Sequence, residues 1–262
     1  MKIRSCCRFQ SILVALMIFS ACAADGPSVK VEKGLTASEL ARFNDTFDKF
    51  REDLWSVTGF IPGESLRAEN FKLADIQVKN GRLSMETKTG GFSGGGMGST
   101  FSLQGDFDIQ VDCKLDFNKT LMDMDQVVML HVIDKSKELT DTELEGVSVG
   151  FLKTIDKQSH IRSFFRERGQ IRGTVVRPCG DFDGTLRVVR KGARYRTMYK
   201  RSGDPEWEGL GQYTRSASEI VVSLRVQNFG ARRENIRATS PFRVQFDNFV
   251  INSAEKIVES EI

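Results

Sequence analysis

Arginine is concentrated in the middle of the chain, where its side chains are suited to binding anions. Between residues 153 and 201, fourteen Lys and Arg residues stand against four Asp and Glu. Guanidinium groups present planar forks of donors that match carboxylate and sulfate groups. Tyrosine and tryptophan rings in and beside the same segment offer flat faces on which sugar rings stack. The predicted ligand-binding residues are Arg162, Arg166, Arg194, Arg196, Tyr195, Tyr199 and Trp207.

An alternative assigns these arginines no ligand. They would make the solvent-exposed face of a β-sheet soluble and would form ion pairs with acidic residues from an earlier segment of the chain. The acids in question are Asp106, Asp108, Asp112 and Asp116.

Those acids belong to a strict alternation of apolar and polar residues over positions 106–117, which read DFDIQVDCKLDF. Successive side chains on a strand point to opposite faces, so the pattern predicts a long strand with one dry face. Similar segments recur without helices between them, and residues 127–133 are apolar on both faces, as in a central strand. The sequence therefore predicts an all-β fold, a two-sheet antiparallel jelly-roll sandwich.

The first 23 residues have the order of a secretory signal peptide: basic residues, an apolar run at 12–19, then small residues. Two processing sites are open. Residues 21–23 fit an A-x-A cleavage site, whereas residues 20–22 resemble a bacterial lipobox that would leave Cys22 lipidated, although Phe19 replaces the usual Leu. The leader predicts export to the periplasm, to the outer envelope as a lipoprotein, or out of the cell. Contact with a membrane is expected only through a lipid on Cys22.

The rest of the chain divides by composition into four parts. Residues 24–35 read as a flexible tether, 36–56 as an amphipathic helix, 57–254 as the sandwich and 255–262 as a polar tail. The helix is predicted from a capping box at Thr36 and Glu39 and from apolar residues spaced by three and four. Asn80-Gly81 predicts a hairpin turn, and a change of phase at Asp247-Asn248 predicts a β-bulge. The glycine run at 90–98 predicts a tight turn or close strand packing.

Charge and cysteine content exclude some classes of partner. A net charge of +3 is too small for an electrostatic nucleic-acid binder, so no nucleic acid is expected. Only Cys113 and Cys179 follow the leader region. Export permits a disulfide between them, but an inward-facing Cys113 also suits a small buried hydrophobic residue.

The phrases NGRLSMETK, FSGGGMGSTF and LQGDFDIQVDCKL, followed by DGTLRVVRKG and PFRVQFDNFVI, resemble the concanavalin-A-like lectin/glucanase jelly roll. The likeness covers nearly all of residues 70–252 and points to exported bacterial members of undefined activity. It implies a concave sheet face that holds a polysaccharide chain. Laminarinase-like relatives carry an E-x-D-x-x-E strand with two catalytic glutamates. Glu143 and Glu145 come nearest to that motif, but its Asp and last Glu are missing here.

Other chemistry has weaker signals. His131 lies in the apolar segment, where a histidine is either a hydrogen-bonded core residue, the simpler interpretation, or a general base. His160 has no Cys or Asp at the spacing of a zinc site. No organic cofactor is expected. A structural calcium ion remains open, because acids alternate in two predicted loops at Asp123 and Asp125 and at Asp181 and Asp183, although neither loop is an EF-hand.

Three functions follow as hypotheses. The leading one is noncatalytic binding of a carbohydrate or cell-envelope polymer, acidic in character, through one sheet face. The second is a glycoside hydrolase or polysaccharide lyase on the same fold. The third is a structural envelope protein that contacts other proteins.

Overall fold

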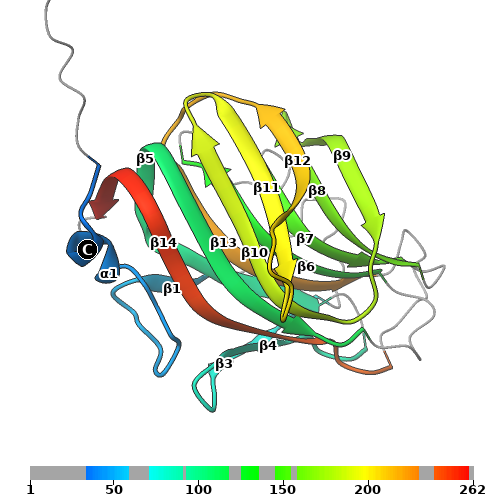
Figure 1. Cartoon of the computed structure of the whole chain (residues 1–262). Helices are drawn as coiled ribbons and strands as arrows, with labels where there is room; N and C mark the ends of the chain where they lie inside the picture. The colour runs from blue at the N-terminus through cyan, green and yellow to red at the C-terminus, as the bar shows by residue number, and fades with distance from the viewer. Residues whose placement is uncertain are drawn as a thin grey trace, which may run out of the picture. The chain divides into compact units, whose positions relative to one another are not determined.

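The computed structural model describes residues 34–58, 71–90, 93–117, 125–135, 145–154, 158–229 and 239–259. These residues belong to one compact unit that begins at Lys33. Their elements are a short helix and fourteen strands (Figure 1): α1 (Ala37–Ala41), β1 (Trp55–Thr58), β2 (Lys72–Leu73), β3 (Asp75–Val78), β4 (Leu83–Glu86), β5 (Ser93–Leu115), β6 (Asp125–Asp134), β7 (Gly146–Lys153), β8 (Ser159–Glu167), β9 (Gln170–Pro178), β10 (Phe182–Lys191), β11 (Arg194–Arg201), β12 (Glu208–Thr214), β13 (Ile220–Phe229) and β14 (Arg243–Glu259).

The strands form two layers that share the long strand β5. The hydrogen-bonded order is β12-β11-β10-β5-β13-β6-β7-β8-β9. The C-terminal half of β5 pairs with β10 and β14, and its N-terminal half pairs with β13 and β1. We call the layer of β14, β10, β11 and β12 the front layer, and the layer of β13, β6, β7, β8 and β9 the rear layer (Figure 1). The predicted two-sheet antiparallel jelly-roll sandwich is confirmed.

One hydrophobic core fills the space between the layers. Along β5, the apolar residues of the alternating segment, such as Ile109 and Val111, are fully buried. β6 contributes Val128, Leu130 and Val132 to the same core. Because neighbouring side chains on a strand alternate between faces, the odd-numbered residues of β6 lie on the outer side of the rear layer.

A glycine and a buried arginine stand where β5 passes from one layer to the other. Gly105 has φ +68°, a backbone conformation that glycine adopts at little cost. Its carbonyl oxygen accepts a hydrogen bond of 2.6 Å from Nε of Arg190, and Arg190 also donates to the carbonyl of Ser218 at 2.6 Å. The guanidinium lies 4.7 Å from the centre of the Phe107 ring. Arg190 is thus a structural residue that joins the bend in β5 to the chain before β13.

The predicted helix over residues 36–56 is wrong beyond its first turn. The capping box is present, since Thr36 accepts a hydrogen bond from the Glu39 amide and Glu39 accepts one from the Thr36 amide. The helix nevertheless ends at Ala41. Asp45 then pairs with Phe249 of β14, and Phe47 has φ +52°, which no α-helix accommodates.

One other boundary also differs from the prediction, and one open alternative is decided. Of the two alternatives for the glycine run, close strand packing holds for residues 93–98: they begin β5 and pair with β13, and a Cβ atom added at Gly96 would overlap with the Leu224 carbonyl oxygen. Residues 255–259 are not a tail, because β14 continues through Glu259 opposite Phe101. The turn at Asn80-Gly81 and the bulge after Asp247 are confirmed: both turn residues have positive φ, and the register shifts between Asp247 and Val250.

Candidate binding face

One face of the rear layer points away from that core. It carries polar side chains beside a second, smaller buried hydrophobic cluster formed by Val127, Met129 and Phe164. The register places His131 of β6 between Ser148 of β7 and Ser223 of β13. We call this surface the rear face. Its residues on the four central strands are Val127, Met129, His131, Ile133, Gly146, Ser148, Gly150, Leu152, His160, Arg162, Phe164, Arg166, Val221, Ser223, Arg225 and Gln227.

Three arginines occupy the rear face. Arg162 and Arg166 lie on β8, opposite Gly150 and Gly146 of β7, so β7 places no side chain beyond Cα between them and β6. Arg225 comes from β13 on the other side of β6, where its Nε donates to the Ser223 hydroxyl at 3.1 Å. Arg162 and Arg166 therefore lie on one side of the small β7 residues Gly146, Ser148 and Gly150, and Arg225 lies on the other side.

Arg162 carries its charge in a partly dry environment. Its guanidinium lies 4.8 Å from the centre of the Phe164 ring. Burial, with a smaller contribution from the nearby Arg166 charge, lowers the pKa of Arg162 to about 10. Its Nε atom is buried and has no hydrogen-bond partner in the part of the chain that the structure describes. Arg162 is still charged at neutral pH, and part of its donor capacity is unused.

His131 and Ser148 lie between these arginines. Among the residues that the structure describes, both ring nitrogens of His131 and the hydroxyl oxygen of Ser148 are buried and have no hydrogen-bond partner. Burial first, and then the charges of Arg225 and Arg166, hold the pKa of His131 well below its usual 6.5. The imidazole is therefore neutral at pH 7 and has one donor and one acceptor nitrogen.

The glycines of β7 cannot carry a side chain. A Cβ atom added at Gly150 would overlap with the carbonyl oxygen of Val128, and one at Gly146 would overlap with that of Val132. Gly146 also has φ +153°, which L side chains rarely adopt. The central strip of the rear face is therefore restricted to small residues, with Ser148 as its polar group.

Acidic groups stand at the ends of the rear face. Glu219, next to the start of β13, accepts hydrogen bonds from Lys135, Ser102 and Gln104, which lower its pKa to about 2. Asp125 begins β6, and its charge counteracts the lowering of the pKa of Arg162. The described positions between these two ends carry no carboxylate. The polar groups that the described residues place on this face include three guanidinium groups, the His131 imidazole and the Ser148 hydroxyl.

The predicted arginine and aromatic patch is divided by the structure. Arg162 and Arg166 lie on the rear face, whereas Arg194 and Arg196 are exposed on β11 of the front layer. Tyr195 and Tyr199 are only 3% and 6% exposed and belong to the core between the layers, so they present no ring for stacking. The prediction that Tyr195 and Tyr199 stack on a ligand is therefore wrong, and Trp207 is the one aromatic residue of the predicted patch that is not in the core.

Trp207, the remaining aromatic residue of that patch, is half-buried on the front side. Its ring lies 4.9 Å from the Arg187 guanidinium and 5.2 Å from the Lys200 ammonium group. Arg187 also forms an ion pair with Asp108 of β5. The alternative in which arginines pair with the acidic strand therefore holds for this part of the front layer.

Of the two glutamates nearest to the glucanase motif, the structure describes one. Glu143 lies outside the described residues. Glu145 accepts a hydrogen bond of 3.1 Å from Arg215, which also pairs with Glu167 at 2.6 Å. Glu145 is thus part of an ion-pair network at the end of β7.

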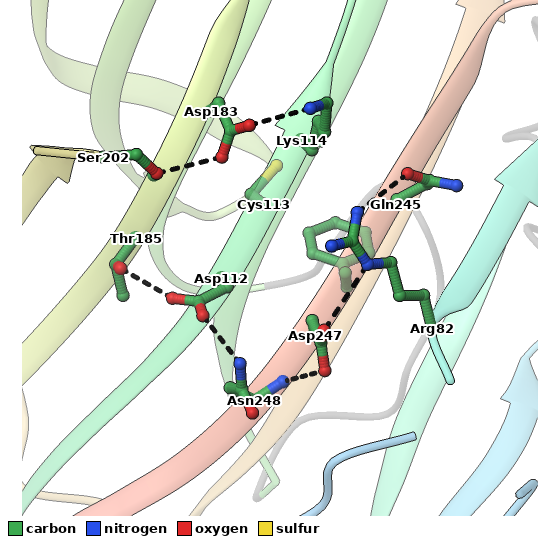
Figure 2. A pocket seen from close by; sticks show the side chains of 12 residues that line it. Arg82, Asp112, Cys113, Lys114, Asp183, Thr185, Ser202, Gln245, Asp247 and Asn248 are labelled. Atoms are coloured by element: carbon green, nitrogen blue, oxygen red, sulfur yellow. Dashed lines mark hydrogen bonds and ion pairs between the residues drawn. The ribbon is translucent and has the colours of Figure 1, made fainter. Parts of the chain in front are cut away.

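A hollow of about 200 Å³ lies on the outer side of the front layer at the β14 bulge. Figure 2 shows that its polar side chains satisfy one another: Lys114 and Ser202 donate to Asp183, and Thr185 and Asn248 donate to Asp112. Its third carboxylate, Asp247, pairs with Arg82. Unlike His131 and Ser148, these groups already have partners within the protein.

Of the two alternatives for the cysteines, the one without a disulfide holds. Cys113 and Cys179 are both free and buried, and the Cys179 sulfur accepts a hydrogen bond of 3.0 Å from Arg201. Burial raises the pKa of both thiols, so neither is poised as a thiolate.

Calcium binding stays a prediction. Asp123 lies outside the described residues, and Asp181 accepts a hydrogen bond from the Phe117 amide. Asp183 is held by Lys114 and Ser202. Within the described ranges, no three His, Cys, Asp or Glu side chains are grouped in a way that suits a metal ion.

Comparison with solved structures decides the fold. A β-glucanase from Bacillus licheniformis matches with a TM-score of 0.56 and 11% identity, over 80% of this chain and 96% of the other. The pseudo β-1,3-glucanase of Mycobacterium tuberculosis, an immunostimulatory antigen, matches at 0.56 and 12%, over 80% and 97%. This chain has the concanavalin-A-like jelly-roll fold. The same fold occurs in the CBM2 module of the evolved Dit of Lactobacillus casei BL23 phage J-1, with a TM-score of 0.54, 9% identity and coverage of 80% and 95%.

At these identities the jelly-roll likeness extends to the fold alone. No known protein family matches the sequence, and no curated protein does. In the described part of this jelly roll, no helix has the length and apolar character needed to cross a membrane.

Proposed function

We propose that this jelly-roll protein is exported and binds a carbohydrate or cell-envelope polymer without cleaving it, through the rear face. The observation that carries the proposal is that buried polar atoms of His131, Ser148 and Arg162, on the outer side of one sheet, have no hydrogen-bond partner among the described residues. Because these atoms have almost no exposed area, a ligand reaches them only if the groups above them move aside. A buried polar group without a partner costs about 1–3 kcal/mol, so a ligand that completes these hydrogen bonds gains affinity.

The location of the face also supports the proposal. It is formed by adjacent strands of a rigid sheet, and its register is regular from β13 to β8. A site on rigid elements loses little conformational freedom when it binds. The likeness to a protein described as a pseudo β-1,3-glucanase supports the absence of cleavage, as an analogy on the same fold.

A glycan array with neutral, carboxylated and sulfated polymers tests the proposal. We expect the purified protein to bind at least one polymer, and the Arg162→Ala/Arg166→Ala double variant to bind it at least about 10-fold more weakly, since hydrogen bonds to charged groups contribute about 1.5–3 kcal/mol each. The Arg194→Ala/Arg196→Ala variant is the matched control, because it removes two exposed arginines from β11 instead.

Two outcomes would contradict the proposal. One is the absence of any bound polymer, and the other is equal weakening in the two double variants. Incubation of the bound polymer with the protein should release neither reducing ends nor unsaturated products; release of either would favour the hydrolase or lyase hypothesis. Cell fractionation of the unaltered chain and its Cys22→Ala variant tests whether a lipid on Cys22 retains the exported protein at the membrane.

A further inference from the structure

We infer that the rear face holds a subsite for an anionic substituent, a carboxylate or a sulfate ester, on the sugar ring of its ligand. This inference rests on the proposed function and deepens it, because it names the chemical group recognised. Arg162 and Arg166 would contact the anion, and His131 and Ser148 would bind the hydroxyl groups beside it.

The arrangement of charge is the first step. Arg162 and Arg166 lie on one strand and face the same side, and Arg225 approaches from the other side of His131. Arg162 forms no ion pair with any carboxylate that the structure describes, in contrast to Arg187, Arg215 and Arg243 elsewhere in the fold. The Asp125 charge acts on Arg162 without forming an ion pair with it. A partly buried guanidinium that has no ion-paired acid among the described residues gains from an acid on the ligand.

The packing of Arg162 is the second step. Its guanidinium is held over the Phe164 ring, which fixes the plane of the donor fork. The facing residue on β7 is Gly150, which leaves the fork uncovered from that strand. A planar carboxylate or one edge of a sulfate matches two parallel N–H donors of such a fork.

The neutral polar groups are the third step. His131 and Ser148 are cross-strand neighbours, and their unpartnered atoms include at least two donors and two acceptors. An anion alone would use only the donors. A ring that carries hydroxyl groups next to its anion uses both, so an acidic sugar satisfies the whole set better than an inorganic anion does.

Binding titrations with matched polymers test the inference. One pair is polygalacturonate and its carboxyl-reduced, neutral form, and the other is a sulfated galactan and its desulfated form. We expect the acidic member of one pair to bind about 10- to 100-fold more tightly than its neutral counterpart. Tighter binding of polygalacturonate identifies a carboxylate, and tighter binding of the sulfated galactan identifies a sulfate.

Variants locate the effect. Arg162→Met keeps an apolar stem over Phe164 but removes the charge, and it should abolish the preference for the acidic member. Arg196→Met, which removes an exposed arginine from the front layer, should leave the preference unchanged. If Arg162→Met does not fold, a salt titration of the unaltered protein decides, because binding through an anion weakens as ionic strength rises.

The inference is overturned if neutral and acidic polymers bind equally, or if Arg162→Met keeps the full preference. The proposed function can survive that result. A polymer that binds regardless of its charge, and that the Arg162→Ala/Arg166→Ala variant no longer binds, would establish the rear face as a site for neutral glycans.

Discussion

At the scale of single residues, His131 is a buried base whose polar atoms find no partner in the described fold. It lies beside Arg225 and Arg166, which further disfavour its protonation. In the unfolded chain the imidazole titrates near 6.5, whereas in the folded protein it titrates well below that value. The unfolded state therefore binds more protons as the pH falls, and the folded state loses stability in that range.

His131→Gln should remove this pH dependence. The unaltered protein is expected to become easier to unfold as the pH decreases from 6.5 toward the lowered pKa of His131, because only the unfolded chain gains the proton. The variant has no imidazole at this position, so its free energy of unfolding should change less over the same interval. Urea denaturation at a series of pH values between 8 and 5 measures the difference.

His160→Gln is the control for His131→Gln. Burial also lowers the pKa of His160, but this side chain is partly exposed, so its substitution should have a smaller effect on the pH dependence. Equal dependence of stability on pH in the unaltered protein and His131→Gln would show that His131 is not the group responsible.

At the scale of strands, the rear face depends on the close approach of β6 and β7. Gly150→Ala should destabilise the fold by about 1–3 kcal/mol, the usual cost of overpacking, because the new methyl group meets the Val128 carbonyl rather than a flexible side chain. Gly209→Ala on β12 is the matched control, since nothing lies within 4 Å of the added atom. Chemical denaturation of both variants checks the expectation; equal stability of the two would show that β6 and β7 separate easily.

The segment from residue 40 to residue 54 shows that the spacing of apolar residues does not determine the path of the backbone. The spacing of five apolar residues predicts a helix: Leu40, Phe43, Phe47, Phe50 and Leu54. Four of them are buried, and Phe50 is partly buried against the same core. They reach the core by way of turns instead, because Asp45 accepts hydrogen bonds from the Phe47 amide and the Trp55 indole at 2.8 Å each. A spacing of three and four identifies which residues enter the core, but buried side-chain hydrogen bonds decide the path of the backbone.

The alternation of side chains along a strand predicts correctly that Arg162 and Arg166 share a face. Applied to β11, the same rule shows that Tyr195 and Tyr199 cannot lie with Arg194 and Arg196. Arg162 and Arg166 are four residues apart on one strand, so they share a face in any register. Arg194 and Tyr195 are adjacent on β11 and must point to opposite faces. The alternation that exposes Arg194 and Arg196 therefore places Tyr195 and Tyr199 in the core.

At the scale of the whole molecule, the rear face is assembled by register between strands that are distant in sequence. Arg225 joins Arg162 only because β13, β6, β7 and β8 lie side by side in that order. The alternation within β13 shows that Arg225 faces away from the core. It carries no information on which strand lies next to β13, since many registers bury the same apolar residues. The fold class was therefore predictable from the sequence, and the composition of the site was not.

The two layers are expected to unfold together, because β5 is shared between them and cannot leave one without disturbing the other. The chain contains two tryptophans that report on different places. Trp55 is buried on β1 beside the N-terminal half of β5, and Trp207 is half-buried on the front layer next to Arg187. Each can be observed alone in the Trp207→Phe and Trp55→Phe variants.

In each variant, the denaturation midpoint followed by the remaining tryptophan should coincide with the midpoint followed by far-ultraviolet circular dichroism. Trp55→Phe should also be the less stable of the two, because it removes the indole that donates to buried Asp45 at 2.8 Å. Both probes are compared within the same variant, so the lower stability of Trp55→Phe affects the two midpoints equally. A Trp207 transition at lower denaturant than the circular dichroism transition would mean that the front layer opens by itself, and that the rear face persists on a layer able to stand without its partner.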